Sequence, residues 1–160
     1  MLTKSKEVHN GVTICQRRVL VVEDEPGISK ICERVLGTEG YDVDVAVNGK
    51  IALAMVREKT YDICLLDIRT PDMNGIDFYE HLKKERPELA HKIIFTTGDV
   101  FSSSIKEFLD KTGQPCLPKP FTPDQLRAIF RTAFGLNQDR TRQVTRSGAN
   151  KYQWASLKGR

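Results

Sequence analysis

Along residues 18–134, short apolar runs alternate with segments in which apolar residues recur every three or four positions. The apolar runs predict five strands, at residues 18–22, 41–47, 63–66, 92–97 and 115–118. The periodic segments that follow them predict five amphipathic helices, which begin near residues 26, 49, 76, 104 and 123. Strict alternation of strand and helix implies parallel strands joined by right-handed crossovers. The expected fold is therefore α/β, a three-layer, open, doubly wound sheet of five parallel strands.

Two of the strands differ in their pattern, which predicts where they lie in the sheet. Residues 63–66 (ICLL) are all apolar, as is typical of a strand buried on both faces. Residues 41–47 (YDVDVAV) alternate apolar and polar positions. This alternation indicates a half-exposed strand near an edge of the sheet.

Three of the predicted helices carry start signals. Pro26 stands in a first helical turn, where its missing N–H costs nothing. Ser104 with Glu107, and Thr122 with Gln125, have the spacing of a capping box, in which each side chain accepts from the other residue's backbone N–H. We expect helices to begin at these positions.

Polar residues stand where the strands end. They are Glu23, Asp24, Asp67, Thr97 and Lys119. In open α/β sheets, ligands bind at the carboxyl edge of the strands, where loops converge over a rigid base. Each residue alone has an ordinary explanation, as the cap of the following turn for Asp67, and otherwise as a solvated lysine, a strand-end cap or the acidic first turn of a helix. Five such residues at the ends of four separate strands favour a functional site.

Three clustered carboxylates predict a cation site. Two carboxylates ~4 Å apart repel by roughly 4 kcal/mol at an effective dielectric constant near 20, and a bound cation removes this penalty. Oxygen ligands without Cys or His favour Mg²⁺ over zinc. Asp67, at the end of the middle strand, is then the best candidate for a nucleophile that attacks a phosphoryl group. Lys119 and Mg²⁺ would neutralise charge, and the Thr97 hydroxyl would donate a further hydrogen bond.

Length and composition limit the classes of protein that fit this sequence. A chain of 160 residues with 39% hydrophobic and 29% charged residues is typical of one globular domain. No apolar stretch approaches a membrane span, and the N-terminus lacks the apolar core of a signal peptide, so we expect a cytoplasmic protein without a membrane partner. The four cysteines are widely spaced, which indicates neither a zinc site nor a disulfide framework.

The excess of basic residues is concentrated at the C-terminal end of the chain. Residues 137–160 hold six Lys/Arg and one Asp, whereas residues 1–136 hold 19 Lys/Arg and 20 Asp/Glu. We expect a loose N-terminal arm at residues 1–16, one domain at residues 17–136 and a basic tail at residues 137–160, which is either disordered or the beginning of a truncated segment. The chain would then be a stand-alone domain or a piece of a larger protein. The tail is too short for a helix-turn-helix domain and has one strong stacking residue, Trp154, so a nucleic-acid partner is not expected.

Four segments resemble the receiver domain of two-component response regulators. They are VLVVEDE around Asp24, LLDIRTPDMNG around Asp67, FTTGD around Thr97 and LPKPF around Lys119. The resemblance covers residues 17–136 and implies a flavodoxin-like fold with strand order 2-1-3-4-5. It also implies a cis peptide before Pro120.

The resemblance further implies a function and its site residues. Asp67 would accept a phosphoryl group from a histidine kinase or histidine phosphotransfer protein. Glu23, Asp24, Asp67 and the backbone carbonyl of Arg69 would hold Mg²⁺. The protein would be a signalling domain, whose only reactions are self-phosphorylation from phosphodonors and slow autodephosphorylation. The face made by the fourth helix, fifth strand and last helix would bind a target or form a homodimer.

Three positions depart from the family pattern. Glu23 replaces the commoner Asp, Thr70 stands where a hydrophobic residue often precedes the proline, and Cys116 occupies a position that is usually Tyr or Phe. In the family that aromatic residue moves inward during activation. The change at Cys116 therefore implies a weaker switch or one that uses other residues.

Other classes fit less well. A phosphatase of the haloacid dehalogenase type needs a second aspartate where Arg69 stands, and a flavodoxin needs a phosphate-binding loop where EDEP follows the first strand. A binding module that has lost phosphorylation is disfavoured because all five site residues are present. We also hypothesise that Arg69 and Asp99 pair across the mouth of the site and limit attack by water on the acyl phosphate.

Overall fold

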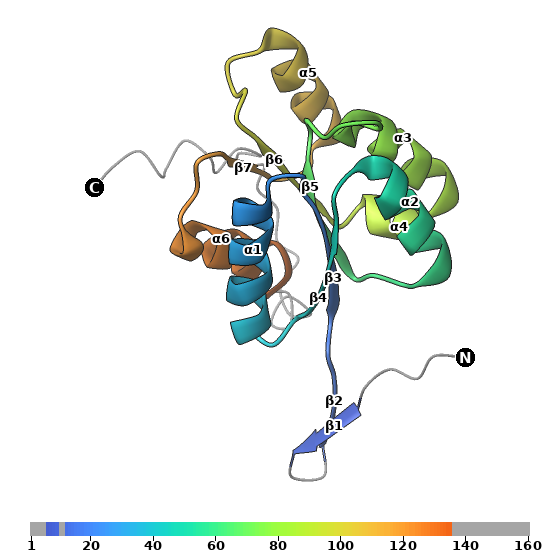
Figure 1. Cartoon of the computed structure of the whole chain (residues 1–160), viewed down its shortest axis with the longest axis vertical. Coiled ribbons are helices and arrows are strands. Elements are labelled where there is room, and N and C mark those ends of the chain that lie inside the picture. Colours follow the sequence, from blue (N-terminus) through green and yellow to red (C-terminus); the bar gives the residue numbers. More distant parts are fainter. Residues whose placement is uncertain (1–5, 10–11, 136–160) are drawn as a thin grey trace, which may run out of the picture.

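Five parallel strands form the central sheet of the computed structural model, which describes residues 6–9 and 12–135 (Figure 1). In chain order the strands are β3 (Arg18–Val22), β4 (Asp42–Ala46), β5 (Ile63–Asp67), β6 (Ile93–Thr97) and β7 (Cys116–Pro118). Their spatial order is β4-β3-β5-β6-β7, and all neighbouring pairs are parallel. Numbered within the sheet, this is the predicted order 2-1-3-4-5.

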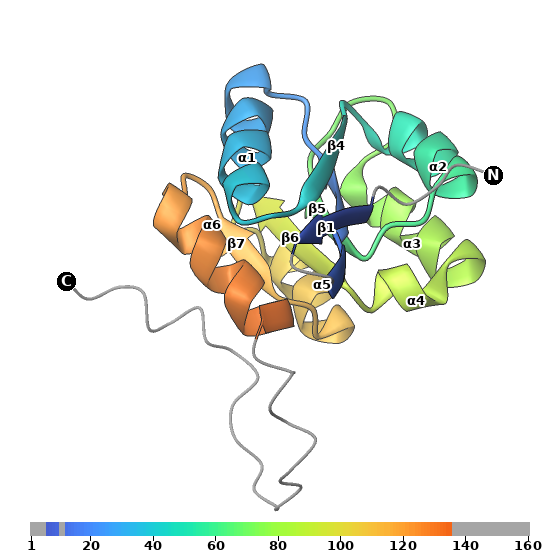
Figure 2. The ribbon, with the colours of Figure 1, turned by 90° about the horizontal axis from the view of Figure 1, so that it is seen from below.

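Helices cover both faces of the sheet, which confirms the doubly wound, three-layer architecture (Figures 1 and 2). The helices are α1 (Pro26–Thr38), α2 (Gly49–Glu58), α3 (Gly75–Glu85), α4 (Pro87–Ala90), α5 (Ser103–Thr112) and α6 (Pro123–Phe130), and α6 continues into a π-helical turn, η1 (Arg131–Gly135). One face carries α1 and α6, and the opposite face carries α2, α3 and α5.

The core consists of two apolar clusters, one on each face of the sheet. Successive residues of a strand point to opposite faces, so Leu20 and Leu66 pack in the cluster under α2 and α3, whereas Val21 and Leu65 pack under α1 and α6. Every residue of β5 is buried, as its continuous apolar run predicted. Strand β4 lies at an edge and is half-buried over most of its length, as its alternating pattern predicted.

Two of the three predicted helix starts are confirmed. Pro26 begins α1, and the capping box of Thr122 and Gln125 is present at the start of α6. The predicted box of Ser104 and Glu107 is wrong, because α5 begins one residue earlier, at Ser103. Glu107 then lies beyond the first residues of the helix and pairs with a lysine one turn further on.

Three short elements were not predicted. Strands β1 (Lys6–His9) and β2 (Val12–Cys15) form an antiparallel pair within the segment expected to be a loose arm, and the pair projects away from the main sheet in Figure 1. The third is the single turn α4, which begins at Pro87. The predicted tail at residues 137–160 lies outside the described residues. No helix in the described part of the chain is long and apolar enough to cross a membrane.

Candidate functional site

The carboxyl ends of four adjacent strands converge on one edge of the sheet. Asp67 is the last residue of β5 and Thr97 the last of β6, whereas Glu23 and Lys119 directly follow β3 and β7. Backbone hydrogen bonds extend the ladder past the strand ends: the Lys119 N–H donates to the Thr97 carbonyl at 2.8 Å, and the Glu23 N–H donates to the Ala46 carbonyl at 3.0 Å. The strand ends therefore fix the backbone of these residues.

Lys119 joins two of the carboxylates. Its Nζ lies 2.7 Å from Asp67 Oδ2 and 2.7 Å from Glu23 Oε2, and 3.7 Å from Glu25 Oε1. The side chains of Lys119, Asp67 and Glu23 are only 11%, 5% and 3% exposed. Charge-assisted hydrogen bonds of this length are strong in a low-dielectric setting. The sequence prediction that Glu23, Asp67 and Lys119 meet is confirmed.

Burial and ion pairing shift the pKa of Glu23 in opposite directions, and the same is true of the pKa of Lys119. Burial raises the pKa of Glu23 above its ordinary value, because loss of hydration disfavours the carboxylate more than its hydrogen bond to Lys119 favours it. Burial also acts to lower the pKa of Lys119, but the hydrogen bonds to Asp67 and Glu23 outweigh it and the pKa is raised. Lys119 therefore stays charged at neutral pH.

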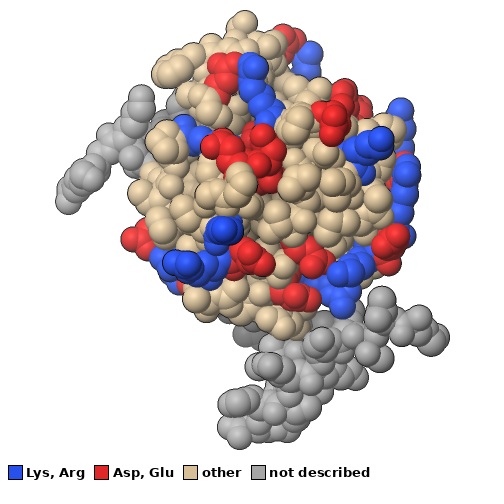
Figure 3. Space-filling model, in the orientation of Figure 1, with Lys and Arg blue, Asp and Glu red and all other residues tan. Residues whose placement is uncertain are grey.

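The donor set of this edge fits Mg²⁺. Glu23, Asp24 and Asp67 each offer a carboxylate oxygen, and these oxygens lie within 4.8 Å of one another. Hard oxygen ligands, with no thiolate or imidazole among the three, are those that Mg²⁺ prefers. Asp24 is exposed, which gives the group access to solvent. In Figure 3 a patch of acidic side chains lies over the carboxyl ends of β3 and β5.

Asp67 also organises the start of the next loop. Its Oδ1 accepts a hydrogen bond from the Arg69 backbone N–H at 2.9 Å, while its Oδ2 accepts from Lys119. The interpretation of Asp67 as the cap of a turn is therefore correct, and it holds together with membership of the acidic site. Gly75 closes the same loop: a Cβ there would lie 2.3 Å from the Asp67 carbonyl oxygen, so no larger residue fits.

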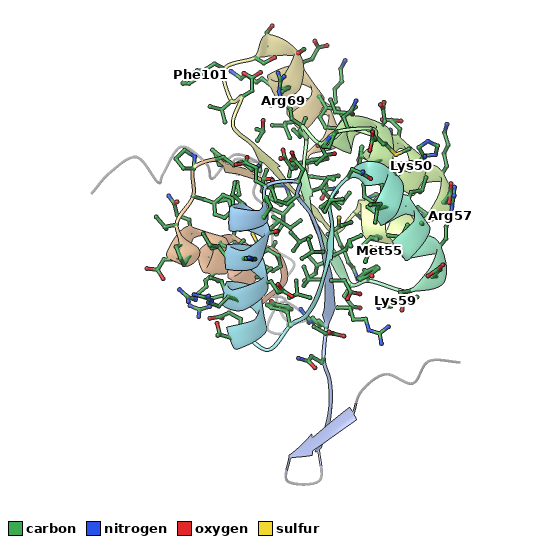
Figure 4. All side chains as sticks on the ribbon, viewed as in Figure 1. Lys50, Met55, Arg57, Lys59, Arg69 and Phe101 are labelled. Carbon is green, nitrogen blue, oxygen red and sulfur yellow. The ribbon has the colours of Figure 1, made fainter. Side chains whose placement is uncertain are left out.

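Thr97 and the mouth of the site lie on the β6 side. The Thr97 hydroxyl oxygen accepts from the Asp99 backbone N–H at 3.0 Å, which leaves its own hydrogen available for donation. Asp99 also forms an ion pair with the Arg69 guanidinium, as predicted from the sequence. Figure 4 shows Arg69 near the amino end of α5, close to the loop that carries Phe101.

Cys116 sits in β7, opposite Phe95 of β6. Burial raises the pKa of its thiol to about 12, so the thiol is protonated at neutral pH. Cys116 packs against the same core cluster as Phe95, where three rings meet edge to face: the centroids of Tyr79, Phe95 and Phe108 are 5.3 to 5.8 Å apart. Aromatic rings from three other elements thus fill this part of the core.

The fold and the site define a flavodoxin-like α/β protein with an acidic, lysine-bridged pocket at the carboxyl edge of its sheet. Residues 19–131 match the family described as the response regulator receiver domain. The chain belongs to this family, whose members are signalling domains of two-component response regulation.

Curated relatives agree with this assignment. The DNA-binding response regulator MtrA of Mycolicibacterium smegmatis is 32% identical over 133 residues, which are 83% of this chain and 57% of MtrA. The aerobic respiration control sensor protein ArcB of Escherichia coli is 34% identical over 128 residues, 79% of this chain and 16% of ArcB. The chain thus spans about half the length of MtrA and a much smaller part of ArcB.

Solved structures show the same fold. A CheY-like receiver domain protein from Methanospirillum hungatei is 30% identical, with a TM-score of 0.67 over 77% of this chain and 98% of that chain. The response regulator TrrA from Thermotoga maritima, solved in complex with Mg²⁺ and BeF, is 29% identical, with a TM-score of 0.65 over 74% of this chain and all of that chain. The receiver fold therefore accounts for the described sheet and its helices.

Proposed function

We propose that this receiver domain is a Mg²⁺-dependent phosphoacceptor and that Asp67 carries the phosphoryl group. The observation that supports the proposal best is the position of Lys119, whose ammonium group bridges Asp67 and Glu23 at 2.7 Å each. Glu23, Asp24, Asp67 and the backbone carbonyl of Arg69 would hold Mg²⁺. The phosphodonor would be the phosphohistidine of a histidine kinase or histidine phosphotransfer protein.

In the proposed reaction, a carboxylate oxygen of Asp67 forms a bond to phosphorus while the P–N bond of phosphohistidine breaks. The electron pair of that bond leaves with the imidazole, which takes up a proton. When bound, Mg²⁺ would neutralise charge on the transferring group. Lys119 contributes the second positive charge, and the Thr97 hydroxyl donates its free hydrogen to a phosphoryl oxygen. Such preorganised groups stabilise charge that develops in the transition state.

The phosphoryl group adds about −1.5 to −2 charges and three acceptor oxygens to the edge. Thr97 and Lys119 directly precede the segments that lead into α5 and α6, so their attraction to the phosphoryl group shifts the face formed by α5, β7 and α6. This face would bind a target or a second copy of the chain. Arg69 stands where a hydrolytic phosphatase of the haloacid dehalogenase type has its acid/base aspartate, which supports signalling rather than turnover.

Phosphorylation from acetyl phosphate tests the proposal. Wild-type protein incubated with acetyl phosphate and Mg²⁺ is expected to gain one phosphate by intact mass, and a chelator is expected to prevent the gain. An acyl phosphate is further expected to be lost on treatment with hydroxylamine. Absence of any mass increment, with Mg²⁺ binding also absent by calorimetry, would instead indicate a receiver that acts without phosphorylation.

The ion pair of Arg69 with Asp99 is expected to prolong the life of the acyl phosphate. It spans two loops that flank Asp67, so it restricts the approach of water. The double substitution Arg69→Ala and Asp99→Ala retains the backbone carbonyl of residue 69 and should shorten the phosphoryl half-life several-fold. Decay of the phosphorylated species after removal of the donor measures this. An unchanged half-life would rule out the role, and Arg57→Ala with Glu85→Ala, a remote exposed ion pair, is the matched control.

A further inference from the structure

The amino end of α2 lies against the loop that joins β5 to α3 (Figure 1). In Figure 4, Lys50 marks this end of the helix. Asn48, the N-cap residue of α2, is only 6% exposed. Its Oδ1 accepts a hydrogen bond from the Ile51 backbone N–H at 2.9 Å, and its Nδ2 donates to Asp72 Oδ2 at 3.0 Å. The Asn48 amide therefore caps one element and holds another.

The next residue strengthens the contact. The Gly49 N–H donates to the Met73 carbonyl at 3.0 Å, and a Cβ on Gly49 would lie 2.7 Å from that oxygen and 2.9 Å from Met73 Cγ. The helix can approach the loop this closely only because residue 49 has no side chain. The same Met73 carbonyl accepts from the Thr70 hydroxyl at 2.9 Å. The Met73 carbonyl oxygen thus accepts one hydrogen bond from α2 and one from within the loop.

Asp72, the residue that Asn48 holds, has a left-handed backbone conformation. Its φ of 63° makes it the one non-glycine residue with positive φ in the described part of the chain. Left-handed geometry is unfavourable for residues with a Cβ and persists where the surroundings fix it. Without the Asn48 amide, the conformation of this loop would lose one of the contacts that fix it.

The held loop begins beside Asp67. The Arg69 N–H is hydrogen-bonded to Asp67 Oδ1, and the Gly75 N–H donates to the Ile68 carbonyl at 2.9 Å, which brings the two ends of the loop together. Because these hydrogen bonds close the loop, we expect the contact at Asp72 to restrain the backbone at Arg69 as well. Residue 69 is the one whose carbonyl is proposed to bind Mg²⁺.

We infer that Asn48 is a positioning residue for the cation site: by holding Asp72, it fixes the loop so that the Arg69 carbonyl is in place before Mg²⁺ binds. This inference rests on the proposed function. Residues that orient metal ligands from the outer shell typically change metal affinity 10- to 100-fold when they are replaced. The competing explanation is that Asn48 only caps α2.

Exchanging the two polar groups separates these explanations. Asn48→Asp keeps the cap oxygen for Ile51 but loses the donor and places a carboxylate against Asp72. Asp72→Asn keeps an acceptor for Asn48 and tolerates the positive φ. The double variant Asn48→Asp with Asp72→Asn restores the hydrogen bond with donor and acceptor exchanged, at unchanged net charge.

Isothermal titration with Mg²⁺ gives the first readout. Asn48→Asp is expected to bind Mg²⁺ about tenfold more weakly than wild type, whereas Asp72→Asn and the double variant bind within about twofold of wild type. Charge alone predicts the opposite order, because a new carboxylate near the site attracts the cation. Affinity of Asn48→Asp equal to or tighter than that of wild type would overturn the inference.

Hydrogen exchange of the metal-free protein gives a second readout. Amides of residues 69–75 are expected to exchange faster in Asn48→Asp and at the wild-type rate in the double variant. If Asn48→Asp does not fold, Asn48→Ser keeps a cap oxygen, adds no charge and takes its place in both measurements. Absence of Mg²⁺ binding by wild type would overturn the proposed function itself, whereas equal binding and exchange in all variants would overturn only the role of Asn48.

Discussion

Asp67→Asn is expected to abolish uptake of a phosphoryl group from acetyl phosphate. The amide cannot act as a nucleophile in place of the carboxylate, and it removes one of the three charges that would hold Mg²⁺. The fold is expected to survive, because the asparagine Oδ1 can still accept from the Arg69 N–H and Lys119 keeps its partner Glu23. Intact mass after incubation with acetyl phosphate and Mg²⁺ measures the effect.

Asp62→Asn is the matched control for this substitution. Asp62 directly precedes β5, at the end of the strand opposite Asp67, and its carboxylate accepts from the Arg18 backbone N–H. The control is expected to gain one phosphate like wild type. A full phosphate increment in Asp67→Asn would show that another carboxylate, such as Asp24, is the acceptor.

Lys119→Met is expected to separate cation binding from phosphoryl transfer. Removing the ammonium group takes away a positive charge that lies 2.7 Å from two carboxylates, so Mg²⁺ should bind more tightly, on the order of tenfold. The rate of phosphorylation should nevertheless fall by about 10²–10³, the usual cost of losing one preorganised group that stabilises transition-state charge. Calorimetry and the rate of mass gain at saturating Mg²⁺ measure the two effects.

The same substitution should also change stability. Breaking a buried ion pair leaves uncompensated carboxylates, which costs about 3–5 kcal/mol of the free energy of unfolding in the metal-free protein. Added Mg²⁺ should restore part of this loss. Lys111→Met is the control, because Lys111 is an exposed lysine of α5 that pairs with Glu107 one turn away. This substitution should leave Mg²⁺ affinity, the rate of phosphorylation and stability unchanged. Parallel losses of Mg²⁺ affinity and rate in Lys119→Met would contradict the assigned role.

Sequence reasoning located the sheet edge because its signals are periodic and repeated. Four of the five strand runs end at a polar site residue, and parallel strands bring those ends together. The pairing of Arg69 with Asp99 followed from the same rule, since each stands two residues beyond a strand-end site residue. The acidic cluster and its lysine could therefore be predicted before any side-chain position was known.

The contact of Asn48 with Asp72 could not be predicted in this way. The Asn-Gly pair at residues 48 and 49 is explained locally as the start of a helix, and nothing in that local pattern says that the other half of the amide bonds a loop 24 residues away. The close approach of Gly49 to Met73 likewise depends on how α2 packs. Packing of this kind is set by the whole fold and not by the spacing of residues.

The missed β1 and β2 strands have a different cause. The two strands have four residues each and pair only with one another, so they contribute no long apolar pattern that links them to the core. The capping error at α5 arose because several serines offer alternative starts. Ser102 precedes the helix, and its hydroxyl lies 2.9 Å from that of Ser104.

The helices on either side of β7 are anchored to very different degrees. On one side, Glu39 of the α1 C-cap forms ion pairs with Arg127 and Arg131, at 3.3 and 3.0 Å, which tie α6 to α1. On the other, Ile105 is the one buried side chain that α5 contributes. In addition, α6 buries two side chains, Leu126 and Phe130, so more contacts hold α6 than α5. We therefore expect a displacement that starts at Thr97 to move α5 more readily than α6.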